Sequence, residues 1–156
     1  MTSKLHYCSM QYAPLFPSGL HPVNEADLDN HFLRAFPESQ TRPALIAGLR
    51  AFLASLKRVG IVFEVWLDGS FCTEKLDPSD VDLVVFADEQ ELNRLDPTVQ
   101  RYLSALLDRS SSKVKFGCDV LFAPAGDFNA RSYWRGWYGF DRNELPKGIV
   151  KVMVTP

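Results

Sequence analysis

Two short segments of the chain carry most of the information: WLDGSF at residues 66–71 and, nine residues after Ser70, DVDLVV at residues 80–85. Their aliphatic, aromatic and β-branched residues predict two buried strands. Because successive side chains of a strand alternate between faces, Asp80 and Asp82 are expected to point to the same face. Two carboxylates this close repel each other unless a proton or cation separates them, and a hard cation such as Mg²⁺ is the natural partner. The pair therefore predicts a metal site.

A third acidic residue, Asp119, lies in the apolar segment KFGCDVLF at residues 115–122. A lone charge in such surroundings is costly unless it is paired or coordinated, and a neighbouring strand could bring it to Asp80 and Asp82. The three carboxylates could then bridge two metal ions and act as the catalytic centre. Two simpler interpretations stay open: Asp80 and Asp82 can belong to a solvated turn, and Asp119 can pair with an Arg or Lys.

The turn at Gly69 and Ser70 is the predicted phosphate contact. Glycine lets backbone N–H groups approach a phosphate closely, and Ser70 adds a hydroxyl at the start of an expected short helix. Asp68 is expected to fix this loop rather than to bind metal. Three cations are further candidates for nucleotide binding: Lys75, Arg142 and Lys147. A positive side chain on a loop is more often only solvated, so that second interpretation of the three cations remains open.

Hydrophobic periodicity around these segments predicts one α+β domain over residues 1–156. The expected elements are an extended arm at 1–23, two helices within 24–60, a motif-bearing core at 61–122 and an aromatic, basic tail at 123–156. Within them we expect strands from 61 to Asp68, at 81–86, at 114–122 after a serine linker at 110–112, and at 149–154. Residues 89–108 are expected to be helical, with a restart at Asp96-Pro97. Asn24 is the expected cap of the first helix and Gly60 the end of the second. The fold predicted is a mixed sheet of about four to five strands flanked by helices.

Composition sets limits on function. Of the 156 residues, 46% are apolar and 23% charged, as a packed single domain requires, and the net charge of −2 disfavours non-specific coating of nucleic acid. Three cysteines without metal-type pairing indicate free thiols, and Cys72 and Cys118 are expected to be small apolar fillers. No signal-peptide run or apolar stretch of about 20 residues is present, so we expect a cytoplasmic protein without a membrane role.

The Gly-Ser turn, the nine-residue gap, the Asp80-Val81-Asp82 motif and the later apolar-flanked Asp119 resemble the signature of the DNA polymerase β-like nucleotidyltransferase superfamily, particularly its minimal members. The resemblance covers residues 62–122, and its two motifs together are fairly specific. It implies an α/β palm, two Mg²⁺ ions (Mn²⁺ being possible) on the three aspartates, and transfer of a nucleoside monophosphate, most simply AMP, from NTP to a hydroxyl. Minimal members resemble antitoxins that modify a partner toxin, and related folds act on RNA 3′ ends, so the acceptor is expected to be protein or RNA.

The aromatic segment WRGWYGFDR at residues 134–142 is not part of that signature. Its rings could stack on a base, but covering an open face of the sheet is the favoured interpretation. The alternative function is a catalytically silent module that binds a nucleotide or a partner. Retention of all three carboxylates argues against that alternative, because a scaffold gains nothing from clustered like charges. A P-loop enzyme is excluded because no G-x-x-x-x-G-K-[ST] sequence occurs.

Overall fold

The computed structural model describes residues 12–156, so part of the expected N-terminal arm, with Cys8, lies outside the described residues. The elements in chain order are β1 (Gly19–Pro22), the 3₁₀ turn η1 (Glu25–Asp27), α1 (Leu28–Phe32), α2 (Arg42–Lys57), β2 (Phe63–Asp68), the 3₁₀ turn η2 (Ser70–Cys72), β3 (Val81–Ala87), α3 (Glu89–Arg94), α4 (Pro97–Leu106), α5 (Arg109–Phe116), β4 (Cys118–Pro124), α6 (Phe128–Tyr138) and β5 (Gly148–Val154).

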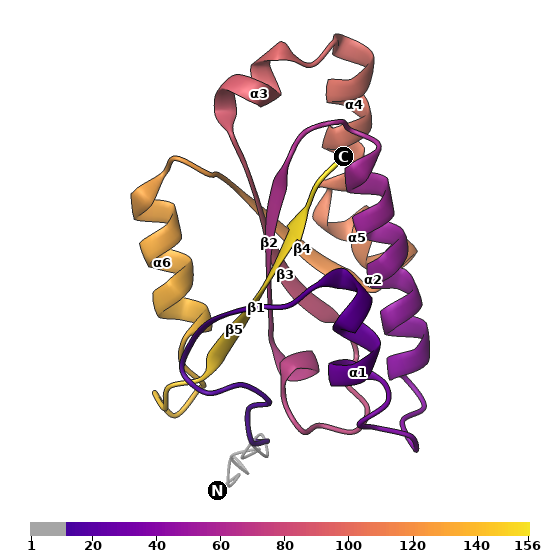
Figure 1. Ribbon diagram of the computed structural model, residues 1–156, viewed down its shortest axis with the longest axis vertical. Coiled ribbons are helices and arrows are strands. Elements are labelled where there is room, and N and C mark those ends of the chain that lie inside the picture. The colour runs from indigo at the N-terminus through magenta and orange to yellow at the C-terminus, as the bar shows by residue number, and fades with distance from the viewer. Residues whose placement is uncertain (1–11) are drawn as a thin grey trace, which may run out of the picture.

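The strands form one mixed sheet in the order β1-β5-β2-β3-β4. The central strand β2 is antiparallel to both β3 and β5, whereas β1 and β4 run parallel to their neighbours β5 and β3. This is the α+β fold with a mixed sheet flanked by helices that the sequence predicts. Helices α1, α2 and α5 lie on one side of the sheet and α6 lies on the other (Figure 1).

The alternation of side chains along each strand divides the core into two apolar clusters. The larger cluster joins one face of the sheet to α1, α2, α4 and α5 and includes the whole stripe predicted for α2: Leu45, Ile46, Leu49, Phe52, Leu53 and Leu56. The smaller cluster, on the opposite face, centres on Trp66, Phe86 and Tyr138 under α6. A polar strand residue whose two neighbours along the strand belong to the larger cluster therefore points to the opposite face, toward α6.

Two sequence-based expectations about local structure are wrong. The serine segment 110–112 is not a linker but part of α5, which Asp108 caps by accepting a hydrogen bond from the Ser111 N–H. The following strand begins at Cys118 rather than at 114, and Val114 is 90% exposed, because Gly117 ends α5 in the left-handed region at φ 69°. The aromatic, basic tail also contains a helix, α6, before its last strand, and this helix was not identified from the sequence.

The N-terminal region also differs. Asn24 forms no side-chain capping hydrogen bond, and the first helix is the short pair η1 and α1 rather than one continuous helix. Residues 19–22, expected as part of an arm, add a fifth strand parallel to β5. In the described part of the chain, no helix has the length and apolar character needed to cross a membrane.

Candidate metal centre

The three predicted aspartates come together at one end of the sheet. Asp82 of β3 lies opposite Asp119 of the parallel strand β4, and Asp80 precedes Asp82 by two residues on the same face. One carboxylate oxygen from each of the three residues lies within 4.8 Å of the others. We refer to Asp80, Asp82 and Asp119 as the acidic cluster. It faces α6, because Asp82 alternates with Val81 and Leu83, which are buried against the other helices.

A fourth carboxylate, Asp68, extends the row onto a third strand, since it is the register partner of Asp82 on β2. Asp68 is only 2% exposed, and its Oδ2 forms an ion pair with Lys147 Nζ at 3.0 Å. Its other oxygen, Oδ1, is buried without a hydrogen-bond partner among the described residues. Burial raises the pKa of Asp68 to about 7 although Lys147 acts in the opposite direction. Lys147 thereby anchors the chain just before β5 to the end of β2.

The carboxylates of the cluster differ in their electrostatics. Burial, followed by repulsion from Asp80 and Asp119, raises the pKa of Asp82 to about 6. Hydrogen bonds from Arg109 lower the pKa of Asp119 instead. Asp82 is therefore the carboxylate whose charge is least compensated by the protein itself, and a cation bound between the three residues would relieve that repulsion.

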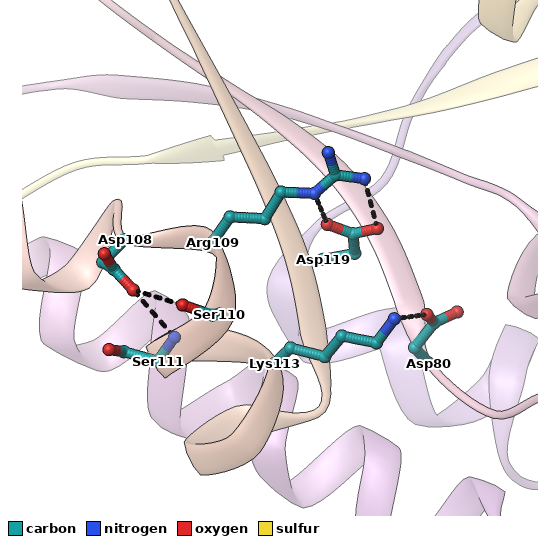
Figure 2. Close-up of polar contacts among 7 residues, drawn as sticks. All are labelled: Asp80, Asp108, Arg109, Ser110, Ser111, Lys113 and Asp119. Carbon is teal, nitrogen blue, oxygen red and sulfur yellow. Dashed lines mark hydrogen bonds and ion pairs between the residues drawn. The ribbon is translucent and has the colours of Figure 1, made fainter.

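Two basic residues of α5, Arg109 and Lys113, reach the cluster from the side of β4, and neither was identified from the sequence. Arg109 binds Asp119 through two hydrogen bonds, Nε to Oδ1 at 2.5 Å and Nη2 to Oδ2 at 3.0 Å, and Lys113 Nζ lies 3.4 Å from Asp80 Oδ2 (Figure 2). The sequence did contain a signal for both residues. Arg109 follows the capping Asp108 directly and Lys113 comes four residues later, a spacing that places both on one face of a helix. Treating residues 110–112 as a linker hid that spacing.

The Gly69–Ser70 turn lies directly against the acidic cluster. Gly69 has φ 75°, and a Cβ atom at this position would stand 2.0 Å from Asp82 Oδ2, so both backbone conformation and space require glycine here. Ser70 opens the turn η2, the short helix that the sequence predicts. The predicted phosphate contact and the predicted metal ligands are thus adjacent in space.

The loop after Gly69 is held by Arg42, a fully buried residue of α2 that sequence analysis also missed. Its guanidinium donates four hydrogen bonds to backbone carbonyl oxygens, those of Phe32, Phe71, Thr73 and Lys75, at 2.7–3.1 Å. Burial lowers its pKa to about 10. Since three of these carbonyls belong to residues 71–75, Arg42 fixes the segment that follows the Gly-Ser turn. No sequence pattern reveals a side chain whose partners are carbonyl groups.

The three predicted nucleotide-binding cations lie at three separate places. Of the three predicted nucleotide-binding cations, Lys147 lies beside the cluster through Asp68, whereas Lys75 lies over the Tyr12 ring, 5.9 Å from its centroid. Arg142 is exposed in the loop between α6 and β5. Cys72 and Cys118 are buried free thiols, as expected, and burial raises the pKa of each.

The aromatic tail only partly covers the sheet. Tyr138 is buried and Trp134 packs against the smaller cluster, as the favoured interpretation predicts, but Trp137 is 68% exposed and Phe140 46%. Beside them, a cavity of about 260 Å³ opens between α6, β1 and β5 and is lined partly by Arg135, Phe140 and Lys147. Lys147 therefore both lines this cavity and pairs with Asp68 beside the acidic cluster.

The donor set fits a hard divalent cation. All three ligand residues offer carboxylate oxygens, which Mg²⁺ and Mn²⁺ prefer, and they come from rigid strands. The oxygen of Asp68 that has no hydrogen-bond partner adds an acceptor next to them. The same residues offer no soft sulfur ligand at the cluster, since the Sγ of Cys118 points to the carbonyl oxygen of Phe116 on the other face. The residues present can therefore hold the ion that the sequence predicts.

Comparisons with known proteins place the chain in a family. Comparison with curated proteins and with solved structures gave no match. A family model matches residues 9–153, nearly the whole chain, including all the residues of the acidic cluster and the Gly-Ser turn. The chain belongs to DUF6932, a family of unknown function.

Proposed function

We propose that this protein is a Mg²⁺-dependent nucleotidyltransferase that moves a nucleoside monophosphate, with AMP favoured, from NTP to a hydroxyl group of a protein or RNA acceptor. The observation that carries the proposal is the contact between the Gly69 backbone and Asp82. It brings a turn suited to phosphate against three carboxylates suited to metal, and a nucleotidyl transfer requires both at one place. The resemblance to the polymerase β-like superfamily supports the same conclusion.

The residues have separate roles in this proposal. Asp80, Asp82 and Asp119 hold the metal, whose positive charge stabilises the negative charge that develops on the triphosphate. The Gly69 backbone and the Ser70 hydroxyl orient the phosphates, and Lys147 adds a positive charge on the same face. The acceptor oxygen bonds to the α-phosphorus, the bond to the β-phosphate oxygen breaks, pyrophosphate leaves, and the hydroxyl proton passes to solvent.

The acceptor must be recognised by surfaces outside the cluster, because the sheet and its helices account for the whole described chain. In our proposal the acceptor approaches from the helices at residues 24–60, from the tail, or with a partner chain. A partner toxin in a toxin–antitoxin or defence system in the cytoplasm is one such acceptor. An RNA 3′ end is the other.

A second candidate function, a silent binding module, is favoured by one specific observation. Arg109 and Lys113 already neutralise Asp119 and Asp80, so the cluster does not strictly need a metal. Both cations are, however, well exposed, with 64% and 56% of their side-chain surface accessible, and exposed ion pairs contribute little to stability. The catalytic proposal remains the better explanation because Asp82 is left without an ion pair among the described residues.

Calorimetric titration tests the proposal. Mg²⁺ and non-hydrolysable ATP, followed by the GTP, CTP and UTP analogues, are titrated into the wild type and into Asp82→Asn, which keeps the side-chain shape and removes the charge. We expect metal-dependent binding by the wild type and an affinity loss of about a hundredfold or more in the variant, because a ligand of the metal is removed. The control is Asp27→Asn, an exposed aspartate at the start of α1 with no side-chain capping bond.

Each result points to one of the two candidates. Equal binding by Asp82→Asn and the wild type would refute the assigned site. No binding of any nucleotide by the wild type would favour a silent module that binds a partner, or a site that only a partner completes. Where binding is found, transfer from α-labelled NTP to protein and RNA acceptors then follows, and it is expected to fail in Asp82→Asn.

A further inference from the structure

The ion pairs between α5 and the acidic cluster occupy the ligands that a metal would need. Arg109 takes both oxygens of Asp119, and Lys113 approaches Oδ2 of Asp80, from positions four residues apart on one helix (Figure 2). Asp82, between them, has no ion pair among the described residues. Two of the three ligands are therefore neutralised by side chains and one is not.

These ion pairs can break without a movement of the helix that carries the two basic residues. Arg109 and Lys113 expose more than half of their side-chain surface, so either can reorient toward solvent. Their helix, by contrast, is fixed: Asp108 caps its start and Phe116 at its end is buried in the larger cluster. Movement would thus be confined to two long side chains anchored at defined places beside the cluster.

Binding of a divalent cation reverses the charge that Arg109 and Lys113 face. Once Asp80 and Asp119 are used as ligands, the two basic side chains lie next to positive charge and have lost their carboxylate partners. They then need another anion, and a phosphate group is one that both guanidinium and ammonium groups bind well. A substrate of a nucleotidyltransferase brings phosphate to this place.

We propose that Arg109 and Lys113 form a displaceable phosphate-binding pair: they hold the metal ligands until a metal ion expels them, and then bind a substrate phosphate. This proposal rests on the proposed function, since it assumes a metal in the cluster. The Gly69–Ser70 turn follows β2, whereas α5 leads into β4, so the pair lies on the other side of Asp82 from the predicted phosphate turn. The phosphate is therefore that of the NTP reaching across the cluster or that of the acceptor.

The test separates metal binding from phosphate binding and needs no activity. Binding of Mn²⁺ alone is measured by electron paramagnetic resonance for the wild type, Arg109→Gln, Lys113→Gln and the double variant. Each single substitution is expected to tighten Mn²⁺ binding by about two- to tenfold, because a competitor for the ligands is removed. Lys115→Gln is the matched control, since Lys115 lies on the same helix, carries the same charge and has its Nζ over the Phe116 ring instead.

Phosphate binding is then measured with Mn²⁺ present, using two probes: a non-hydrolysable ATP analogue and a short single-stranded oligoribonucleotide. If the pair binds the NTP, both substitutions weaken the ATP analogue by about tenfold each. If the pair binds the acceptor, the ATP analogue is unaffected and the oligoribonucleotide is weakened. Tighter Mn²⁺ binding with neither probe weakened would overturn the phosphate-binding role.

Failure of this inference can be told from failure of the proposed function. Mn²⁺ binding by the wild type that is unchanged or weaker in Arg109→Gln and Lys113→Gln would show that the ion pairs are permanent supports, while leaving the metal centre intact. Absence of Mn²⁺ binding even in the double variant would overturn both proposals. Mn²⁺ binding only in the double variant would show that the metal cannot expel the two side chains, and it would overturn the displacement while leaving the carboxylates as a possible metal site.

Discussion

On one face of the sheet, α1, α2, α4 and α5 bury an apolar surface in which residues such as Leu49, Leu53 and Val85 have no exposed area. On the other face, α6 covers only a small apolar cluster, and the ends of three neighbouring strands present Asp68, Asp82 and Asp119 in register. The first face is closely packed with apolar side chains. The second carries charges that repel each other. The comparison indicates that the apolar contacts of the first face stabilise the fold, and that this stabilisation offsets the charge repulsion on the second face.

Replacing a glycine on the covered face is the strongest way to break this comparison. A Cβ atom on Gly48 of α2 would stand 2.0 Å from the carbonyl oxygen of Phe116, at the point where α2 crosses α5. We expect Gly48→Ala to destabilise the protein by about 3 kcal/mol, because the helices must move apart in a filled core. Urea unfolding followed by circular dichroism measures this.

A neighbouring residue supplies the control for that substitution. Ala47, the residue before Gly48, is exposed on the same helix, so Ala47→Gly should destabilise by only about 1 kcal/mol through helix propensity. Propensity alone would make Gly48→Ala stabilising. If Gly48→Ala is neutral or stabilising, the close packing of α2 on α5 is refuted and the covered face is less rigid than the structure indicates.

The pH dependence of stability sharpens the comparison at the acidic face. The pKa of Asp82 is about 6 in the folded protein, above the value of about 3.9 expected for an unfolded chain. Between these values the folded state binds more protons than the unfolded state, so the contribution of Asp82 to stability falls as pH rises from about 4 to about 6 and stays low above that. Asp82→Asn should therefore be more stable than the metal-free wild type at pH 7.5, by on the order of 1 to 3 kcal/mol, and no more stable near pH 4.

A second carboxylate should show the opposite sign. The pKa of Asp119 is lowered by Arg109, so its pairing adds stability above the unfolded value that is lost as pH falls through the lowered pKa. Asp119→Asn is expected to be less stable than the wild type at pH 7.5. Denaturant unfolding at pH 4 and pH 7.5, without divalent ions, measures both variants. If Asp82→Asn is less stable than the wild type at pH 7.5, the repulsion that we assign to the cluster is contradicted. Added Mg²⁺ is expected to stabilise only proteins that keep Asp82.

The contrast between the faces also explains how much the sequence could predict. The stripe of α2, the strands around Val65 and Val84, and the Asp80–Asp82 pair follow from local periodicity, and the structure confirms these elements. The approach of Asp119 to that pair required a guess about strand neighbours, and β3 and β4 do pair in the register needed. These features repeat every two or every three to four residues, so a single sequence contains them.

What the sequence did not predict depends on long-range contacts. Arg42 is invisible because its partners are backbone carbonyl groups on a distant loop, and residues 19–22 become a strand only because β5 lies beside them. The segment 110–112 was misassigned because serine is a poor helix former whose helical state here depends on the Asp108 cap and on the burial of Ser112 and Phe116. With that helix missed, Arg109 and Lys113 could not be placed at the acidic cluster.

The smallest effect that we predict concerns a glycine on α6, the counterpart of Gly48 on the other face. Nothing lies within 4 Å of a Cβ atom built on Gly136, although this residue stands inside the helix. Gly136→Ala should therefore stabilise the protein by about 0.5 to 1 kcal/mol, because alanine loses less backbone entropy in a helix and meets no neighbour. Thermal and urea unfolding measure it, with Mn²⁺ affinity expected to be unchanged because the acidic cluster is not touched. Opposite signs for the same substitution at Gly48 and Gly136 would show that α2 packs closely on α5 whereas α6 has no close neighbour at Gly136, and a loss of stability at Gly136 would remove that distinction.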